Sequence, residues 1–353
     1  MRILAIDPAG GLWGSERALL DLIASASALQ FAVCCPPHTP LCAELQRRGI
    51  PVFPWFVEWL HEKPRWRRAQ AALGVLRACL AFRPDAIHLN QTGAWRVALP
   101  ASTLLRLPLI AHVRIFEDVA YLAERRPSPS QLRAIVAISG AVEQDLRRRS
   151  ELASIPVHRL LDAFQLHPQS ISVARHPRRL ACVGRIAPIK GQELLLQAMA
   201  EAEALSDAEC WLIGDGASDF VQPLKANCPH QVVWCGVAAN VPERLRSCSV
   251  LVCPSHREPL GRVIFEAWDA GAIPVVFAGS GGAAEVVSAA DAGLIYAEQT
   301  PAALGQAIAA ALALPPSEHA RLIANGRAWL QANCSPRHYG QAITRVFEQA
   351  CRV

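Results

Sequence analysis

The stretch Val250-Leu-Val-Cys-Pro-Ser-His-Arg-Glu-Pro-Leu-Gly-Arg-Val-Ile-Phe-Glu-Ala-Trp-Asp-Ala-Gly-Ala-Ile-Pro-Val-Val-Phe277 contains two short apolar runs with a longer segment between them. The runs, residues 250–253 and 273–277, have the length and composition of strands that are buried on both faces. We expect the segment between them to form a helix that begins just after Glu258, with Pro259 in its first turn. The stretch therefore predicts one repeat of an α/β fold with a parallel sheet.

The same alternation of short apolar runs and helical patterns extends along most of the chain. Candidate strands in the first half are residues 3–7, 31–35, 51–55, 86–90, 109–113, 134–138 and 157–161. Those in the second half are residues 180–184, 211–214, 232–235, 250–253, 273–277 and 293–296. Residues 164–178, with two prolines, interrupt the rhythm.

A chain of 353 residues is long for one core, which favours two domains. We predict two doubly wound, Rossmann-like α/β domains that face each other across a cleft. The predicted boundaries are residues 1–165, a linker at 166–178, a second domain at 179–334 and a last helix at 335–353.

Composition and charge narrow the class of protein. The twelve cysteines form no Cys-x-x-Cys pair, as expected of reduced cysteines in a cytoplasmic protein. No apolar run approaches the length of a membrane span, and the N-terminus does not read as a signal peptide. Residues 1–170 carry a net charge of +6 and the remainder −1, so we expect the first half to meet an anionic partner or surface. No nucleic-acid-binding motif is evident, and no nucleic acid partner is predicted.

Two loops after predicted strands have the composition of anion sites. The loop at residues 8–17 contains Gly11 among several glycines, which let backbone N–H groups approach an anion, although a tight turn would need the same residues. We expect Ser15 to cap the helix that follows. In the loop at 184–191, Arg185 and Lys190 combine a planar fork with a compact charge, which suits two neighbouring phosphates. Solvated surface cations are the alternative.

The two glutamates of the opening stretch would bind opposite ends of one ligand. A helix start near Leu260 and Gly261 would direct backbone N–H groups towards a phosphate. Glu266, on the helix, could accept two hydrogen bonds from the vicinal diol of a ribose, and Glu258 would lie near a sugar. Alternatively, Glu258 only complements the helix dipole and Glu266 pairs with an arginine.

Three motifs together resemble a known family. They are Gly184-Arg-x4-Lys-Gly191, Glu258-Pro-Leu-Gly-Arg-x3-Glu266-Ala-x2-Ala-Gly271 and Gly281-Gly-x2-Glu285-Val-Val. In this order they are similar to the retaining GT-B glycosyltransferases of family four, glycosyl transferases group 1. The resemblance covers nearly the whole chain, including the glycine-rich loop and a final helix that in the family crosses back to the first domain.

The resemblance implies transfer of a sugar from a nucleotide diphosphate sugar to an acceptor hydroxyl with retention, in bacterial surface polysaccharide or glycolipid assembly. Arg185 and Lys190 would neutralise the diphosphate, Leu260 and Gly261 would offer backbone N–H groups, and Glu266 would hold the ribose. Glu258 would contact the hydroxyls of the donor sugar, and His112 would lie near the reacting sugar. The alternative for His112 is that it is a buried structural histidine. Gly11 would approach the phosphates from the first domain. No metal and no further cofactor are expected, because cations and a helix N-terminus can stabilise the leaving diphosphate.

Two departures from the family pattern and two alternative functions remain. Pro259-Leu260 stands where the family often has Gly-Phe, and Leu161-Asp-Ala-Phe-Gln165 replaces a common Asn-Gly-x-Asp, which puts the contacts of that segment in doubt. A related GT-B nucleotide-sugar epimerase and a non-catalytic GT-B binding module are the alternatives.

Residues 55–68 suggest where the acceptor comes from. Three tryptophans and four cations fall within this stretch, a combination that suits a peripheral patch on an anionic membrane. We therefore expect a glycan or lipid-linked acceptor and a cytoplasmic protein, peripheral on the inner face of the membrane. The alternative is an ordinary helix with its tryptophans in the core.

Overall fold

The computed structural model describes residues 1–55, 65–168, 175–238 and 241–352. The chain divides into two compact units. Unit 1 comprises Met1–Gln165 together with Cys334–Val353, and unit 2 comprises Leu166–Asn333. The chain therefore leaves unit 1 once and returns to it at its C-terminal end.

Unit 1 is built around a parallel sheet of seven strands in the described part of the chain. The strands are β1 (Arg2–Ile6), β2 (Gln30–Cys35), β3 (Val52–Pro54), β4 (Ala86–Leu89), β5 (Leu109–Val113), β6 (Leu132–Ala137) and β7 (Val157–Arg159). Their order in the sheet is β3-β2-β1-β4-β5-β6-β7. The helices are α1 (Gly14–Ser25), α2 (Pro40–Arg47), α3 (Arg65–Phe82), α4 (Trp95–Leu105), α5 (Phe116–Arg125), α6 (Gly140–Arg147) and α14 (Pro336–Arg352).

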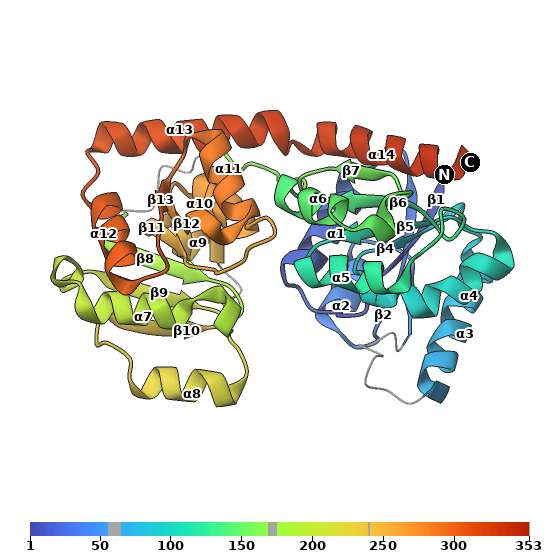
Figure 1. Ribbon diagram of the computed structural model, residues 1–353, viewed down its shortest axis with the longest axis horizontal. Helices are drawn as coiled ribbons and strands as arrows, with labels where there is room; N and C mark the ends of the chain where they lie inside the picture. The colour runs from blue at the N-terminus through green and yellow to red at the C-terminus, as the bar shows by residue number, and fades with distance from the viewer. Residues whose placement is uncertain (56–64, 169–174, 239–240, 353) are drawn as a thin grey trace. The chain divides into compact units, whose positions relative to one another are not determined.

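Helices cover both faces of this sheet, and the two ends of the chain lie near each other in unit 1 (Figure 1). Every residue of β4 and β5 is buried, as their apolar sequences predict for strands inside a parallel sheet. The last helix, α14, packs against α1 and contributes Phe347 to the core that contains Ile3 and Phe31.

Unit 2 contains a parallel sheet of six strands in its described residues. The strands are β8 (His176–Val183), β9 (Glu209–Ile213), β10 (Val232–Gly236), β11 (Cys248–Cys253), β12 (Ile273–Phe277) and β13 (Leu294–Tyr296), in the order β10-β9-β8-β11-β12-β13. The helices are α7 (Gln192–Glu201), α8 (Ser218–Ala226), α9 (Val241–Arg246), α10 (Arg262–Ala270), α11 (Gly282–Ala290), α12 (Pro301–Leu312) and α13 (Pro316–Asn333).

The predicted fold class, two Rossmann-like α/β domains with parallel sheets, is confirmed. The predicted linker is too long. Strand β8 begins at His176, inside the stretch assigned to the linker, because Pro177 lies at the beginning of a strand, where a proline is tolerated. Residues 169–174 of that stretch lie outside the described residues. No described helix is long and apolar enough to cross a bilayer.

Candidate active site

Two loops of unit 2 meet where the chain order of the strands reverses, between the neighbouring strands β8 and β11. Open α/β sheets bind ligands beyond the carboxyl ends of their strands at such a switch point. The loop after β8 reaches Gly191, where an added Cβ would come within 2.2 Å of the Pro254 carbonyl oxygen, in the loop after β11. Gly191 also has a φ of 71°, which a residue with a side chain rarely adopts. The two loops can therefore lie against each other only because residue 191 is glycine.

Lys190 and Glu258 form an ion pair across these loops. The Lys190 Nζ lies 2.6 Å from Glu258 Oε2, and the Ser255 hydroxyl donates to the same oxygen at 3.2 Å. Burial of the Lys190 ammonium opposes its charged form, but the Glu258 carboxylate outweighs burial and holds the pKa of Lys190 above its usual range. The structure thus brings together two of the predicted site residues, 68 positions apart in the chain, as a charged pair.

Arg185 lies in the same loop as Lys190 and is exposed. Its backbone carbonyl accepts a hydrogen bond from the Gln192 side chain at 3.0 Å, while the Ala187 N–H donates to that side chain at 3.3 Å. The positive charge of Arg185 lies close enough to lower the pKa of Lys190, but the Glu258 carboxylate raises that pKa by more. One loop therefore presents two cations, one paired and one exposed.

Helix α10 begins later than the sequence suggested. It starts at Arg262, after Gly261 with a φ of 81°, so Pro259 precedes the helix and is not in its first turn. Leu260 is 2% exposed, and Glu266 lies just over one turn into α10, partly exposed. The predicted residues 260, 261 and 266 thus flank the N-terminal end of one helix, whose first N–H groups point out of its end.

The turn before α10 is fixed by the loop after β12. The Glu258 N–H donates to the Ser280 carbonyl at 2.6 Å. At Gly282 an added Cβ would come within 1.9 Å of the Pro259 carbonyl oxygen. The glycine pair that the third sequence motif contains therefore allows the backbone at 258–260 to pack closely, which positions the Glu258 carboxylate.

In unit 1 the corresponding switch point lies between β1 and β4, and Gly11 is in the loop that follows β1. The indole ring of Trp13 lies against Gly11, where an added Cβ would come within 2.6 Å of it. The prediction that Ser15 caps α1 is wrong. Trp13 is the N-cap residue, and Glu16 accepts its backbone N–H at 2.8 Å, the reciprocal half of a capping box.

His112, in β5, is fully buried. Its Nδ1 lies 3.4 Å from Arg114 Nη2 and 3.3 Å from His88 Nε2. A guanidinium only donates, so Nδ1 accepts and the ring proton is on Nε2, which has no hydrogen-bond partner among the described residues. Burial, with the Arg114 cation and then His88 adding to it, holds the pKa of His112 well below its usual range, so the ring is neutral.

A buried polar network that the sequence analysis did not identify joins the ends of the strands in unit 1. Arg114 Nη1 lies 2.7 Å from Asp162 Oδ1, and its Nε donates to Asn90 Oδ1 at 2.9 Å. Asn90 in turn donates to Asp7 Oδ2 at 2.6 Å. Burial, with the charge of Glu16, raises the pKa of Asp7 to about 6.

The position of these polar residues in the chain is the signal that could have revealed them. Asp7, Asn90 and Arg114 each directly follow a strand, and Asp162 comes soon after β7. The carboxyl ends of parallel strands share one edge of a sheet, where polar residues gather. Asp162 belongs to the segment whose contacts were in doubt, and its partner is Arg114.

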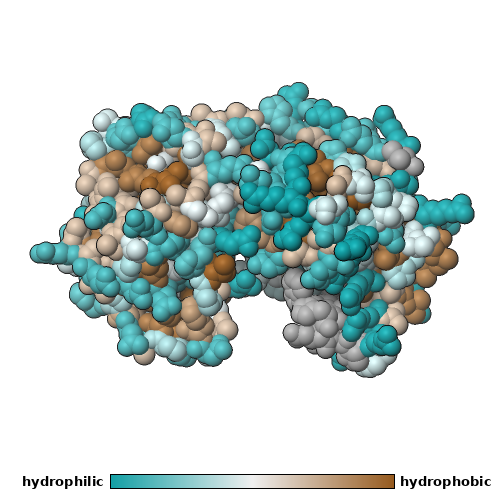
Figure 2. Space-filling model, in the orientation of Figure 1, coloured by the Kyte–Doolittle hydropathy of each residue, from teal (hydrophilic) through white to brown (hydrophobic). Residues whose placement is uncertain are grey.

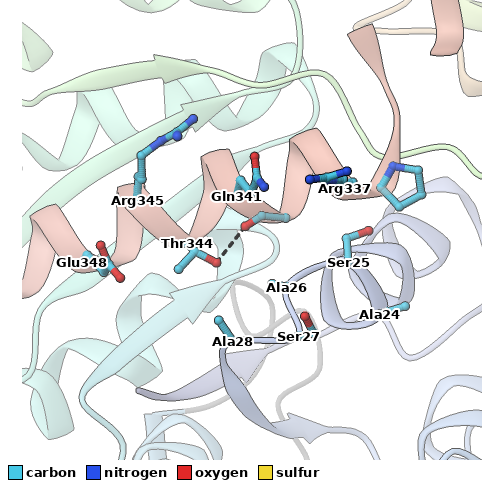
Figure 3. Close-up of a pocket in the computed structure, with 12 residues that line it drawn as sticks. Ala24, Ser25, Ala26, Ser27, Ala28, Arg337, Gln341, Thr344, Arg345 and Glu348 are labelled. Atoms are coloured by element: carbon cyan, nitrogen blue, oxygen red, sulfur yellow. Dashed lines mark hydrogen bonds between the residues drawn. The ribbon is translucent and has the colours of Figure 1, made fainter. Parts of the chain in front are cut away.

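A surface hollow of about 580 Å³ lies away from these residues, where the end of α1 meets α14 (Figure 3). It is lined by residues 24–28 and by Arg337, Gln341, Thr344 and other α14 side chains. The Thr344 hydroxyl donates to the Gly340 carbonyl at 2.7 Å. An added Cβ on Gly340 would come within 2.0 Å of the Ser25 carbonyl oxygen, so the hollow flanks a tight contact between the two helices.

Comparison with known proteins agrees with this arrangement. Residues 164–329 match the family of glycosyl transferases group 1, and residues 14–165 match the glycosyl transferase 4-like domain. The D-inositol 3-phosphate glycosyltransferase of Segniliparus rotundus is 28% identical over 296 residues, which cover 72% of this chain and 64% of that protein. The glycogen synthase of Thioalkalivibrio sulfidiphilus is 31% identical over 149 residues, which cover 38% and 31%. The chain thus spans less than two thirds of the length of these relatives.

Solved structures share the fold. Anabaena HepE in complex with UDP-glucose has a TM-score of 0.84 and 21% identity, with 99% of each chain covered. Sucrose-phosphate synthase of Thermosynechococcus elongatus has a TM-score of 0.79 and 18% identity, with 99% of this chain and 98% of that chain covered. At 21% and 18% identity, these two structures show that the chain has the GT-B fold. The two family matches adjoin and together span residues 14–329, and on that ground the chain belongs to the glycosyl transferases group 1.

Proposed function

We propose that the protein transfers a sugar from a nucleotide diphosphate sugar to an acceptor hydroxyl with retention of the anomeric configuration, in the assembly of a bacterial surface polysaccharide or glycolipid. The observation that carries this proposal is the cluster at the β8–β11 switch point, where Arg185, Lys190 and Glu258 come together. Two cations and the N-terminal end of a helix suit a diphosphate, and a carboxylate beside them suits sugar hydroxyls. The names of the relatives, one a glycosyltransferase and one crystallised with UDP-glucose, support the same reaction.

Each residue of the cluster has a role in this proposal. Arg185 and Lys190 neutralise the diphosphate, and the backbone N–H groups at Leu260 and Gly261 donate to its oxygens. Glu266 accepts hydrogen bonds from the ribose hydroxyls, and Glu258 from the hydroxyls of the donor sugar. Since Glu258 is already bound to Lys190, sugar and diphosphate would meet at this ion pair.

In unit 1, His112 offers an Nε2–H donor that has no partner among the described residues. A neutral imidazole in this tautomer can donate to a sugar hydroxyl without adding charge, which is the role we propose for it. A small rearrangement must first expose the ring, because His112 is fully buried. The contact of Gly11 with the phosphates remains a prediction.

The chemical step needs one bond exchange. The acceptor oxygen bonds to the anomeric carbon as the bond from that carbon to the diphosphate oxygen breaks. The acceptor attacks from the face on which the diphosphate leaves, and this preserves the configuration. The proton of its hydroxyl passes to an oxygen of the departing phosphate on the same face. Stabilisation of the leaving diphosphate by Arg185 and Lys190 is the electrostatic part of catalysis. We also propose that this pair makes a divalent metal unnecessary, so activity should persist in EDTA.

The test is incubation of the protein with UDP, GDP and ADP sugars and a panel of glycan and lipid-linked acceptors. Release of the nucleoside diphosphate with a new glycoside of unchanged anomeric configuration, read by NMR, is the expected result. An isomerised sugar without transfer would identify an epimerase instead. Calorimetric binding of a nucleotide sugar without any turnover would identify a binding module.

We place the protein on the cytoplasmic face of the membrane, as a peripheral protein without nucleic acid partners. The proposal follows from the reduced-cysteine composition and from the basic first half of the chain. Fractionation of cells, with release of the protein from membranes at high salt, is the measurement that checks it.

A further inference from the structure

Helix α3 carries apolar residues on two sides. Its inner side is buried against unit 1 and consists of Ala71, Gly74, Val75, Ala78, Cys79 and Phe82. On its outer side Trp66, Leu73 and Leu80 are 61%, 45% and 58% exposed. They are spaced seven residues apart, close to two helical turns, and so form one stripe. A helix that buries only one side is normally polar on the other, so this outer stripe is suited to a second apolar environment.

The charges that helices α3 and α4 themselves carry all have one sign. Helix α3 packs against α4, and the two helices carry the cations Arg65, Arg67, Arg68, Arg77 and Arg96 but no aspartate or glutamate. The Arg67 guanidinium lies 5.3 Å from the centre of the Trp66 ring. Leu104, at the end of α4, is 68% exposed. Figure 2 shows hydrophobic residues over α3 at the right-hand edge of the molecule, beside hydrophilic ones.

In the described residues, the exposed apolar and basic surface extends further along the chain than the predicted membrane patch at residues 55–68. The Trp55 indole donates to the Gln70 carbonyl at 2.9 Å. Its ring lies against Gly74, where an added Cβ would come within 2.0 Å of it. Trp55 therefore packs on α3, and residues 56–64 lie outside the described residues. Of the described residues in the stretch 55–68, Trp66 belongs to the outer stripe.

We propose that the outer stripe of α3 docks on an anionic lipid bilayer, with Trp66, Leu73 and Leu80 at the interface and the arginines at the headgroups. Tryptophan is favoured at that depth, and arginine reaches phosphates while its stem lies on apolar surface. A second copy of the chain fits less well, because pairing α3 with α3 brings arginines together and no residue of α3 is an aspartate or glutamate that could match them. The docking itself does not depend on the proposed sugar transfer; only its consequence, access to a lipid-linked acceptor, does.

The experiment is co-sedimentation of the full chain with phosphatidylcholine vesicles, with and without phosphatidylglycerol. We expect binding only with phosphatidylglycerol, weakening as salt rises, because the charges are screened. Changing Arg65, Arg67 and Arg68 together to Ser should weaken binding about 100-fold, at roughly fivefold for each arginine. Leu73→Ser with Leu80→Ser should weaken it about tenfold or more, because two apolar side chains lose their burial. Calorimetry with UDP, or with GDP or ADP if one of those is the nucleotide bound, should give the same affinity for all variants.

The matched control removes the same charge elsewhere in unit 1. Arg147, Arg148 and Arg149, at the end of α6, are changed to Ser; Arg147 and Arg149 already pair with Glu143 and Asp145. An equal loss of binding in this control would show diffuse attraction and overturn the assignment to α3. No binding at low salt would overturn it too, as would a dimer in solution that the leucine variants dissociate. Vesicle binding without any sugar transfer would leave the docking intact and refute the proposed function.

Discussion

Lys190 is the cation on which the proposed donor site depends most. It is one of only three lysines among 35 basic residues, and it is held 2.6 Å from Glu258. Its position is specified twice, by the glycine after it and by the carboxylate opposite.

We predict that Lys190→Ala lowers kcat/KM by about 100-fold or more, in line with the loss of one group that stabilises charge in the transition state. The variant also leaves the Glu258 carboxylate without its cation, which adds repulsion towards a diphosphate. Steady-state kinetics measure the effect. Lys225→Ala, which removes an exposed lysine of α8, is the control and should keep wild-type kinetics. Unchanged kinetics in the Lys190 variant would refute its role.

We predict that substitutions of Glu266 and Glu258 have different effects, because the two carboxylates bind different parts of the donor. Glu266→Ala should weaken binding of the free nucleoside diphosphate, because the ribose loses its acceptor. Glu258→Ala should leave that affinity unchanged or raise it, because Lys190 is released from its pair, yet it should lower turnover. Calorimetry with UDP, GDP and ADP decides, and equal, wild-type affinity in both variants would contradict the division of roles.

At the scale of elements, the ends of the strands in unit 1 are tied by buried polar groups. The Arg114–Asp162 pair has side chains only 4% and 3% exposed, and it links the end of β5 to the segment after β7. Substitution of one partner of such a pair by a neutral residue leaves the charge of the other partner buried and uncompensated. Beneath it, in β4, burial and the Arg114 cation lower the pKa of His88 to about 3.

The low pKa of His88 predicts a loss of stability in acid. An unfolded histidine, with a pKa of about 6.5, binds a proton that the folded state excludes, so stability is complete above that pH and falls towards pH 3. When the pH falls from 7 to 5, the free energy of unfolding of the wild type should therefore decrease by about 2 kcal/mol more than that of His88→Phe. Urea unfolding at both pH values measures the difference. Asp7, whose raised pKa acts in the opposite direction, is present in both proteins and cancels.

A gap between wild type and His88→Phe that does not change from pH 7 to pH 5 would contradict this prediction. His158→Phe is a useful second comparison, because its pKa is also lowered by burial but it is only partly buried and should show a smaller effect.

At the scale of the whole molecule, the last helix belongs to the core of the first part of the chain. The α14 residues in that core are Tyr339, Ile343, Val346, Phe347 and Ala350. We predict that deletion of residues 334–353 destabilises unit 1 by roughly 2 kcal/mol for each large side chain removed, and spares unit 2. Hydrogen exchange should show lost protection in β1 and β4 with β8 and β11 unchanged. Deletion of residues 352–353 alone is the control; equal loss in both units would contradict the prediction.

The sequence by itself determined the class of fold and most of the strands. Residues 109–113 and 273–277 are strands with the predicted bounds, because a continuous apolar run of that length has few other stable states than a strand inside a parallel sheet. It also singled out Lys190 and Glu258, since glycine, charge and helix signals are local. Local pattern does not predict helix α4 as one helix, because it contains Pro100, a residue that usually ends a helix.

Only the tertiary structure decided which of these residues meet. Lys190 pairs with Glu258 across 68 positions, and Asn90 donates to Asp7 across 83. Such contacts depend on the order of strands in the sheets, which local pattern does not encode. Burial of His112 and exposure of Leu73 and Leu80 depend on it too, because each is apolar or neutral in sequence and acquires its environment from the elements that pack around it.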